Sequence, residues 1–120
     1  MRQLILIVTM VFALMLPALS SAHAVIVQSS LKTSPPSPHQ ASEIHLFFNS
    51  DIEPVLSIVN LVSKGDQKRP LPIRLGEKRG EILVELPALP PGDYALQLKV
   101  FAADGHLTED ILEFTIQEEK

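Results

Sequence analysis

Short apolar runs, separated by turn-forming residues, are the feature of this sequence that most restricts its fold. Residues 94–101 carry a large apolar side chain at every second position, which is the two-residue period of a half-buried strand. Further short runs with strand character occupy residues 25–29, 43–49, 56–62, 71–75, 81–86 and 111–116. No segment after residue 22 keeps the 3.6-residue period of a helix. We therefore predict an all-β fold of about seven strands, arranged as a Greek-key β-barrel or sandwich.

The first 22 residues are typical of a secretory signal peptide. Arg2 provides a positive start, and residues 4–19 form an apolar stretch before a group of small residues. An uncleaved membrane anchor is the alternative interpretation. The stretch is short for a membrane span, however, and Pro17 interrupts its end. We expect residues 1–22 to be removed on export.

The position of the cut decides which residue begins the mature protein. Ser20-Ser21-Ala22 ends a run of small residues, so cleavage after Ala22 would leave one domain over residues 23–120 that starts with His23. The tripeptide Ala22-His23-Ala24 fits a cleavage site as well, and a cut after Ala24 would discard the histidine. We prefer the first site, and the second stays open.

The composition excludes several kinds of site. The chain has no cysteine, so it has neither a disulfide framework nor a thiolate metal site. Its three methionines, Met1, Met10 and Met15, all lie in the predicted signal peptide. A metal site in the mature domain must therefore use nitrogen and oxygen ligands, which excludes a blue-copper centre. The formal net charge of −4 argues against a nucleic-acid partner.

A histidine at the predicted mature N-terminus is paired with a distant Asp104-Gly105-His106. A free α-amine and the imidazole of His23 can close a chelate ring on one metal ion. Asp104 and His106 are two residues apart, so on an extended backbone their side chains would project to the same side. Together these groups form a compact nitrogen and oxygen set, for which Cu(II) has the highest affinity among the divalent first-row metals.

Each of these residues also has a simpler interpretation. Asp104-Gly105 is a common turn pair, and His23 could be incidental to a cleavage site. His39 lies in a proline-rich loop, where we expect a solvated side chain. His45 alternates with buried positions, and we expect it at the surface rather than on a metal.

Several segments of the chain resemble the CopC family of periplasmic copper-binding proteins, and the resemblance spans essentially all of the mature domain. The combination of a His-Ala after the signal peptide with Ala-Asp-Gly-His after a long strand is its most specific part. The matching segments are His23-Ala24, residues 29–35, residues 44–48, residues 86–89, residues 91–94, residues 102–106 and residues 113–116.

The resemblance implies a cupredoxin-like or immunoglobulin-like β-barrel that binds one Cu(II) ion through His23, Asp104 and His106. It also implies a periplasmic or cell-surface location, a role in copper homeostasis or resistance without enzymatic activity, and a CopD-type membrane partner. Once processed, the protein itself would not span the membrane. Members of the family often have a glutamate where this chain has Ser50, with Asp51 beside it, so a fourth side-chain ligand is open.

Two other classes of function are compatible with parts of this pattern. Lytic polysaccharide monooxygenases also hold copper with an N-terminal histidine brace on a β-sandwich. This chain has no tryptophan and only Tyr94 as a tyrosine, so it lacks an aromatic platform for a polysaccharide. The third possibility is a metal-free immunoglobulin-like interaction module, which would bind no copper after correct processing.

Overall fold

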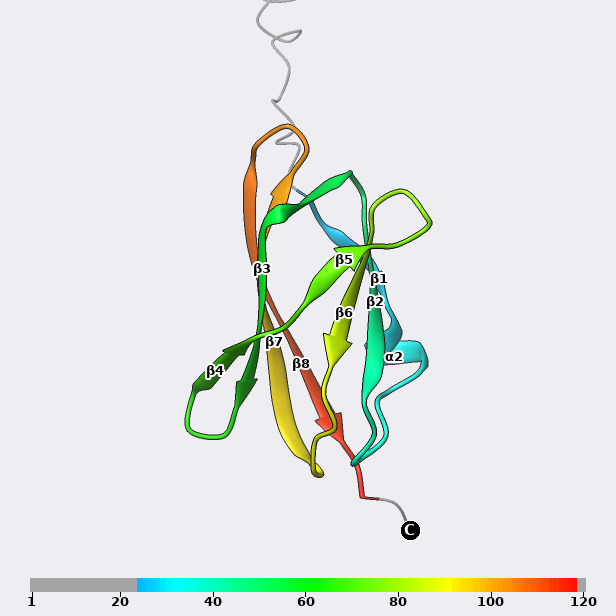
Figure 1. Ribbon diagram of the computed structural model, residues 1–120, viewed down its shortest axis with the longest axis vertical. Coiled ribbons are helices and arrows are strands. Elements are labelled where there is room, and N and C mark those ends of the chain that lie inside the picture. The colour runs from blue at the N-terminus through cyan, green and yellow to red at the C-terminus, as the bar shows by residue number, and fades with distance from the viewer. Residues whose placement is uncertain (1–23, 119–120) are drawn as a thin grey trace, which may run out of the picture.

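The computed structural model describes residues 24–118, which form two antiparallel four-stranded sheets facing each other (Figure 1). A one-turn helix, α2 (Ser30–Thr33), follows β1. The prediction of an all-β sandwich is confirmed. The first sheet has the order β1-β2-β6-β5, with bounds Ile26–Ser29, Ser42–Phe48, Glu81–Leu86 and Ile73–Leu75. The second has the order β4-β3-β7-β8, with bounds Gln67–Pro70, Ile52–Ser63, Gly92–Ala102 and Leu107–Ile116.

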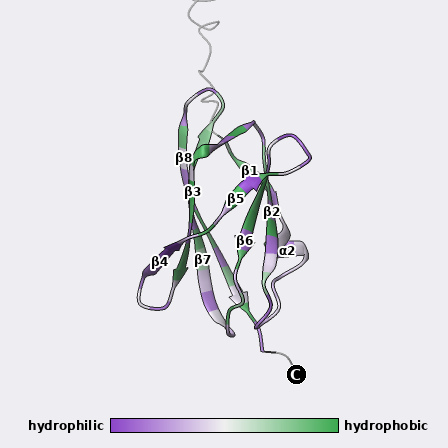
Figure 2. Cartoon of the chain, viewed as in Figure 1, coloured by the Kyte–Doolittle hydropathy of each residue, from purple (hydrophilic) through white to green (hydrophobic). Residues whose placement is uncertain are grey.

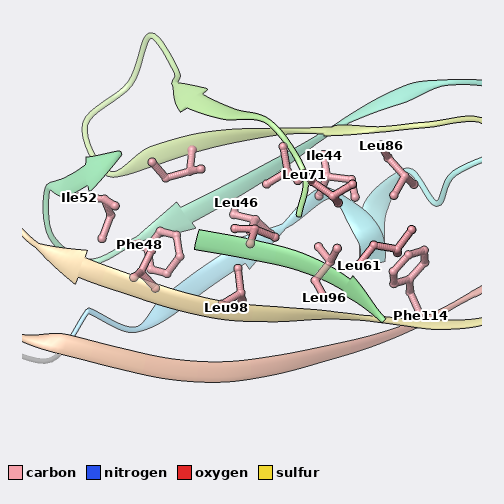
Figure 3. Close-up of a cluster of buried hydrophobic side chains, with 14 of the residues drawn as sticks. Ile44, Leu46, Phe48, Ile52, Leu61, Leu71, Leu86, Leu96, Leu98 and Phe114 are labelled. Atoms are coloured by element: carbon pink, nitrogen blue, oxygen red, sulfur yellow. The ribbon is translucent and has the colours of Figure 1, made fainter. Parts of the chain in front are cut away.

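The hydrophobic core lies between the sheets and follows the two-residue period of the strands. Ile44, Leu46 and Phe48 on β2 are buried, as the alternation predicts. Figure 3 shows them in one cluster with Leu96 and Leu98 of β7, both of which are completely buried. Full burial of a side chain of this size contributes about 1.5–3 kcal/mol. The two sheets are therefore held face to face mainly by this layer.

Strand β4 is the one that the periodicity does not predict. All four of its residues are exposed, and Figure 2 shows the strand as hydrophilic. It pairs with the end of β3 across a turn in which Gly65 and Asp66 have positive φ angles. Because β4 is held by backbone pairing and buries no apolar face of its own, it has no apolar alternation in the sequence. Leu71, expected within a strand, is instead buried in the link between β4 and β5.

Three segments that are far apart in the sequence meet at one end of the sandwich. They are the start of β1, the link between β2 and β3 at residues 49–51, and the turn between β7 and β8 at residues 103–106 (Figure 1). The candidate ligands Asp104 and His106 lie at this end. Within residues 24–118 there is no helix of the length and apolar character that crossing a membrane requires.

Candidate metal centre

The turn between β7 and β8 carries two of the three predicted ligands. The Ala102 N–H donates to the His106 carbonyl at 2.9 Å, and the Gly105 N–H donates to the Ala102 carbonyl at 2.9 Å. Gly105 has a φ angle of 90°, which a residue without a β-carbon adopts easily. The hairpin reverses here, so the backbone from Asp104 to His106 is not extended, and Asp104-Gly105 forms a turn as its simpler interpretation predicts. The tight turn, rather than strand alternation, sets the geometry of the pair.

Asp104 and His106 contact each other directly within this turn. One carboxylate oxygen accepts the His106 backbone N–H at 3.1 Å, and the other lies 2.9 Å from Nδ1 of the ring. The pKa of Asp104 lies below its usual value because the His106 backbone N–H, and then its ring, donate hydrogen bonds to the carboxylate. Both side chains are well exposed, so the carboxylate is ionised and accessible at neutral pH.

The contact distance is compatible with shared coordination of one metal ion. Two donors that each lie about 2.0 Å from a divalent metal, at the right angle of a square-planar site, are about 2.8 Å apart. The 2.9 Å between the Asp104 oxygen and His106 Nδ1 is close to that value. The same distance is also that of a hydrogen bond that orients a histidine ring. The pair can therefore act as two ligands, or as a ligand and the group that orients it.

The link at residues 49–51 joins the start of the described chain to this turn. The Val25 N–H donates to Oδ1 of Asn49 at 2.8 Å, and the Asn49 N–H donates to the Val25 carbonyl at 3.0 Å. Two residues further on, the Asp51 carbonyl accepts the Ala103 N–H at 2.9 Å. Val25 is two residues after His23, and Ala103 immediately precedes Asp104. A three-residue segment thus connects the neighbours of both halves of the predicted ligand set.

Ser50 and Asp51 occupy the positions where a fourth side-chain ligand was left open. The Ser50 hydroxyl is buried and has no hydrogen-bond partner within residues 24–118. The Asp51 carboxylate lies 3.2 Å from Nε of Arg79, in the loop between β5 and β6. That loop lies against the link at Gly80, where an added β-carbon would be 3.2 Å from the Ser50 carbonyl oxygen. The Gly80 carbonyl also accepts the Phe48 N–H, at the end of β2, at 2.8 Å. Asp51 thus contributes its backbone to the turn and its side chain to an ion pair.

The predicted N-terminal ligand, His23, lies outside the described residues. The residue that follows it, Ala24, is completely buried and belongs to the hydrophobic core. Among residues 24–118, no group of three or more histidine, cysteine, aspartate or glutamate side chains could hold a metal ion. A metal site that used Asp104 and His106 would therefore need a further donor beyond the acidic and histidine side chains of residues 24–118.

The remaining histidines lie away from this end. His39 is exposed in the proline-rich loop with a φ angle of 60°, in agreement with a solvated position. His45 faces outward from β2, as predicted, with its two ring nitrogens near the carboxylates of Glu81 and Glu43 at 3.5 and 3.8 Å. Because these carboxylates approach opposite sides of the ring, they do not converge on one point.

Two residues at this end, Asn49 and Arg79, carry no signal in the sequence analysis. Asn49 closes the predicted run at residues 43–49, and Arg79 lies between the predicted runs at residues 71–75 and 81–86. A polar residue that directly follows a strand is an ordinary turn signal. Only the register of β1 on β2 brings Asn49 to Val25, 24 residues away in the chain.

The fold as a whole is similar to that of known proteins. No curated protein sequence matches the chain. The structure is similar to that of CopC from Methylosinus trichosporium OB3b, with a TM-score of 0.62 and 25% sequence identity over 78% of this chain and 93% of that one. It is also similar to PcoC, a methionine-rich copper resistance protein from Escherichia coli, with a TM-score of 0.60 and 21% identity over 80% and 100% of the two chains. At 21% identity the second likeness concerns the fold alone.

The sequence profile of the CopC domain matches residues 26–117. This match covers every strand from β1 to β8 and includes the turn with Asp104 and His106. It therefore extends over well more than half of the chain. The chain belongs to the CopC family.

Proposed function

We propose that this chain is an exported Cu(II)-binding protein of copper homeostasis or resistance, and that it binds one ion through His23, Asp104 and His106. CopC proteins bind copper and are not enzymes, which supports the choice of metal and of class. In this proposal the α-amine and ring of His23 form a chelate. Asp104 and His106 supply the remaining oxygen and nitrogen donors.

The observation that carries the proposal is the hydrogen bonding of the link at residues 49–51. Asn49 binds Val25, and the Asp51 carbonyl binds Ala103. The first contact fixes the chain two residues after His23, and the second fixes it one residue before Asp104. Chain neighbours of the proposed N-terminal donor and of the turn donors therefore bind the same short segment. This arrangement supports a site assembled from both.

The burial of Ala24 supports cleavage after Ala22 rather than after Ala24. Ala24 has no exposed surface and packs in the core, so cleavage after Ala24 would remove a core residue along with His23. A cut after Ala22 keeps that residue and leaves His23 one peptide bond from a buried anchor. The ligand would then be held near the turn at little further entropic cost.

The proposed oxidation state follows from the ligand chemistry. With no cysteine, and no methionine after residue 22, the mature domain offers no sulfur ligand. Soft Cu(I) prefers sulfur, whereas amine, imidazole and carboxylate suit Cu(II). PcoC is described as methionine-rich, and in this respect the present chain differs from it. We infer a single Cu(II) site and weak retention of Cu(I).

The cellular role in this proposal is sequestration or delivery of copper outside the cytoplasm. The signal peptide at residues 1–22 would direct the protein to the periplasm, or to the cell surface in an organism with one membrane. A CopD-type membrane protein would be the partner that receives or supplies the ion. The exposed position of Asp104 and His106 is compatible with such a transfer.

Mass measurement and copper titration of the same preparation test the proposal. The full chain is expressed with its signal peptide, and the exported protein is purified and weighed intact. We expect the mass of a chain that begins with His23, and one equivalent of Cu(II) bound with nitrogen hyperfine splitting in the paramagnetic resonance spectrum. A chain that begins with Val25 or retains residues 1–22, or one that binds no Cu(II), would contradict it.

A further inference from the structure

The side chain of Asn49 replaces a backbone acceptor at the point where β2 ends. Strands β1 and β2 pair as far as Ile26 and Phe48, so Val25 and Asn49 come next along the ladder. The Asn49 N–H still donates to the Val25 carbonyl at 3.0 Å, as in a regular antiparallel pair. The return bond from the Val25 N–H goes to Oδ1 of the Asn49 side chain, at 2.8 Å.

Because the Asn49 side chain accepts this bond, the Asn49 carbonyl does not have to face β1, and the backbone can turn away from that strand. The next residues cross toward β7, where the Asp51 carbonyl accepts the Ala103 N–H. A residue without a side-chain acceptor could follow the same path only by leaving the Val25 N–H without this partner. Asn49 therefore lets the chain hold the start of β1 and reach the turn with Asp104 within three residues.

We propose that Asn49 is a positioning residue that fixes the N-terminal donor of His23 relative to Asp104 and His106. This inference rests on the proposed function. Val25 is 53% exposed, so its own side chain contributes little anchoring. The start of β1 is held by two features. Ala24 is packed in the core, and the Val25 backbone is hydrogen-bonded to Asn49 of the neighbouring strand's end. Both constraints act before the metal arrives, so the chain next to the proposed ligand is already ordered when the ion binds.

Two variants of matched size separate the acceptor from the bulk of the side chain. Asn49→Leu removes Oδ1, whereas Asn49→Asp keeps an oxygen at the same place. Asn60→Leu is the control, because Asn60 contacts Gln97 at 3.4 Å across β3 and β7, in the other sheet. All three are purified as exported, processed protein. The metal-free protein is studied first by amide hydrogen exchange, and then titrated with Cu(II).

We expect Asn49→Leu to lose protection of the Val25 amide and to bind Cu(II) about 10-fold more weakly, the smaller end of the range for removal of a residue that orients a ligand. Its paramagnetic resonance spectrum at saturating copper should contain a second species. Asn49→Asp should retain the protection, bind at least as tightly as the wild type and give one species. Asn60→Leu should match the wild type in all three measurements.

Two results would overturn the inference, and they differ from failure of the proposed function. One is an Asn49→Leu protein with unchanged Val25 protection and copper affinity. Another is an affinity loss that follows only a lower melting temperature, with a single copper species, because a purely structural role predicts that pattern. If wild-type protein protects Val25 but binds no Cu(II), the proposed function itself is wrong, and with it the positioning role of Asn49.

Discussion

Two contacts between a histidine and a carboxylate, Asp104 with His106 and His45 with Glu81, differ in where they lie and in how the chain forms them. Asp104 and His106 lie two residues apart in an exposed turn, with 2.9 Å between a carboxylate oxygen and Nδ1. His45 and Glu81 are brought together by the pairing of β2 with β6, at 3.5 Å. The first pair is local and accessible at the end of the sandwich. The second lies on the outer face of a sheet.

Their further partners explain why only the first pair is a candidate ligand set. Glu81 is largely buried and also accepts the Glu77 backbone N–H at 2.9 Å, so its carboxylate holds the loop between β5 and β6. The His45 ring lies between Glu81 and Glu43, and Glu43 is paired in turn with Arg74. The Glu43 carboxylate is thus already engaged by Arg74, and the Glu81 carboxylate by the loop backbone. The same residue types therefore stabilise a sheet surface in one place and can receive an ion in the other.

Removal of a proposed metal ligand, from the turn or from the N-terminus, should have the largest effect on copper affinity. We expect His106→Ala, or one extra residue before His23, to lower Cu(II) affinity by on the order of 100-fold or more. Loss of a direct ligand should exceed the 10–100-fold typical of an orienting partner. Competitive titration measures the affinity, and paramagnetic resonance measures the number of nitrogen ligands.

The matched control for this prediction is His45→Ala. It removes the histidine of the other pair and should leave the copper spectrum and affinity unchanged. Opposite results, with a changed spectrum in His45→Ala and none in His106→Ala, would assign the metal to the sheet surface instead. The comparison between the two pairs would then be reversed.

The next largest effect concerns the free energy of unfolding, which depends on the contacts of Glu81. A β-carbon at Gly76 would lie 1.8 Å from Oε1 of Glu81, so Gly76→Ala must displace that side chain from its bonds. We expect a loss of about 1–3 kcal/mol in the free energy of unfolding, as for other overpacked sites, and no change in Cu(II) affinity. Chemical denaturation measures this loss. In a Glu81→Ala background the same change should cost less, and an equal cost in both backgrounds would contradict the explanation.

A smaller effect is expected for Asp104→Asn. The amide keeps an oxygen near the metal but loses the charge, so Cu(II) affinity should fall by about 10-fold, less than for His106→Ala. Asp93→Asn is the control, because Asp93 also accepts a hydrogen bond within the β7–β8 hairpin, from Thr115 at 2.8 Å, but at its other end. Equal losses in both variants would point to overall charge rather than to the site.

The sequence predicts the parts of this structure that depend on local pattern. Residues 81–86 form a strand with the predicted bounds, because their apolar run is flanked by clear turn signals. Asp104 and His106 are recognisable for the same reason, since they are neighbours in one short motif. The positions of Asn49 and Asp51 could not be predicted, because their contacts depend on how β1 and β7 are placed beside the link. Strand β4 was missed because it has no apolar face.

The smallest effect should appear in the pH dependence of stability. Partial burial raises the pKa of Glu81, but hydrogen bonds from His45 and the loop backbone outweigh it, and the pKa lies below the usual 4.5. A lowered folded-state pKa contributes stability that is fully present above the unfolded-state value, and that is lost as the pH falls through the folded-state value.

We therefore expect wild-type protein to melt at a higher temperature than Glu81→Gln above pH 4.5, and the difference to shrink below it. Glu113→Gln, at an exposed site on β8, should track the wild type throughout. A constant difference between wild type and Glu81→Gln across this range would show that the charge of Glu81 is not what holds the loop.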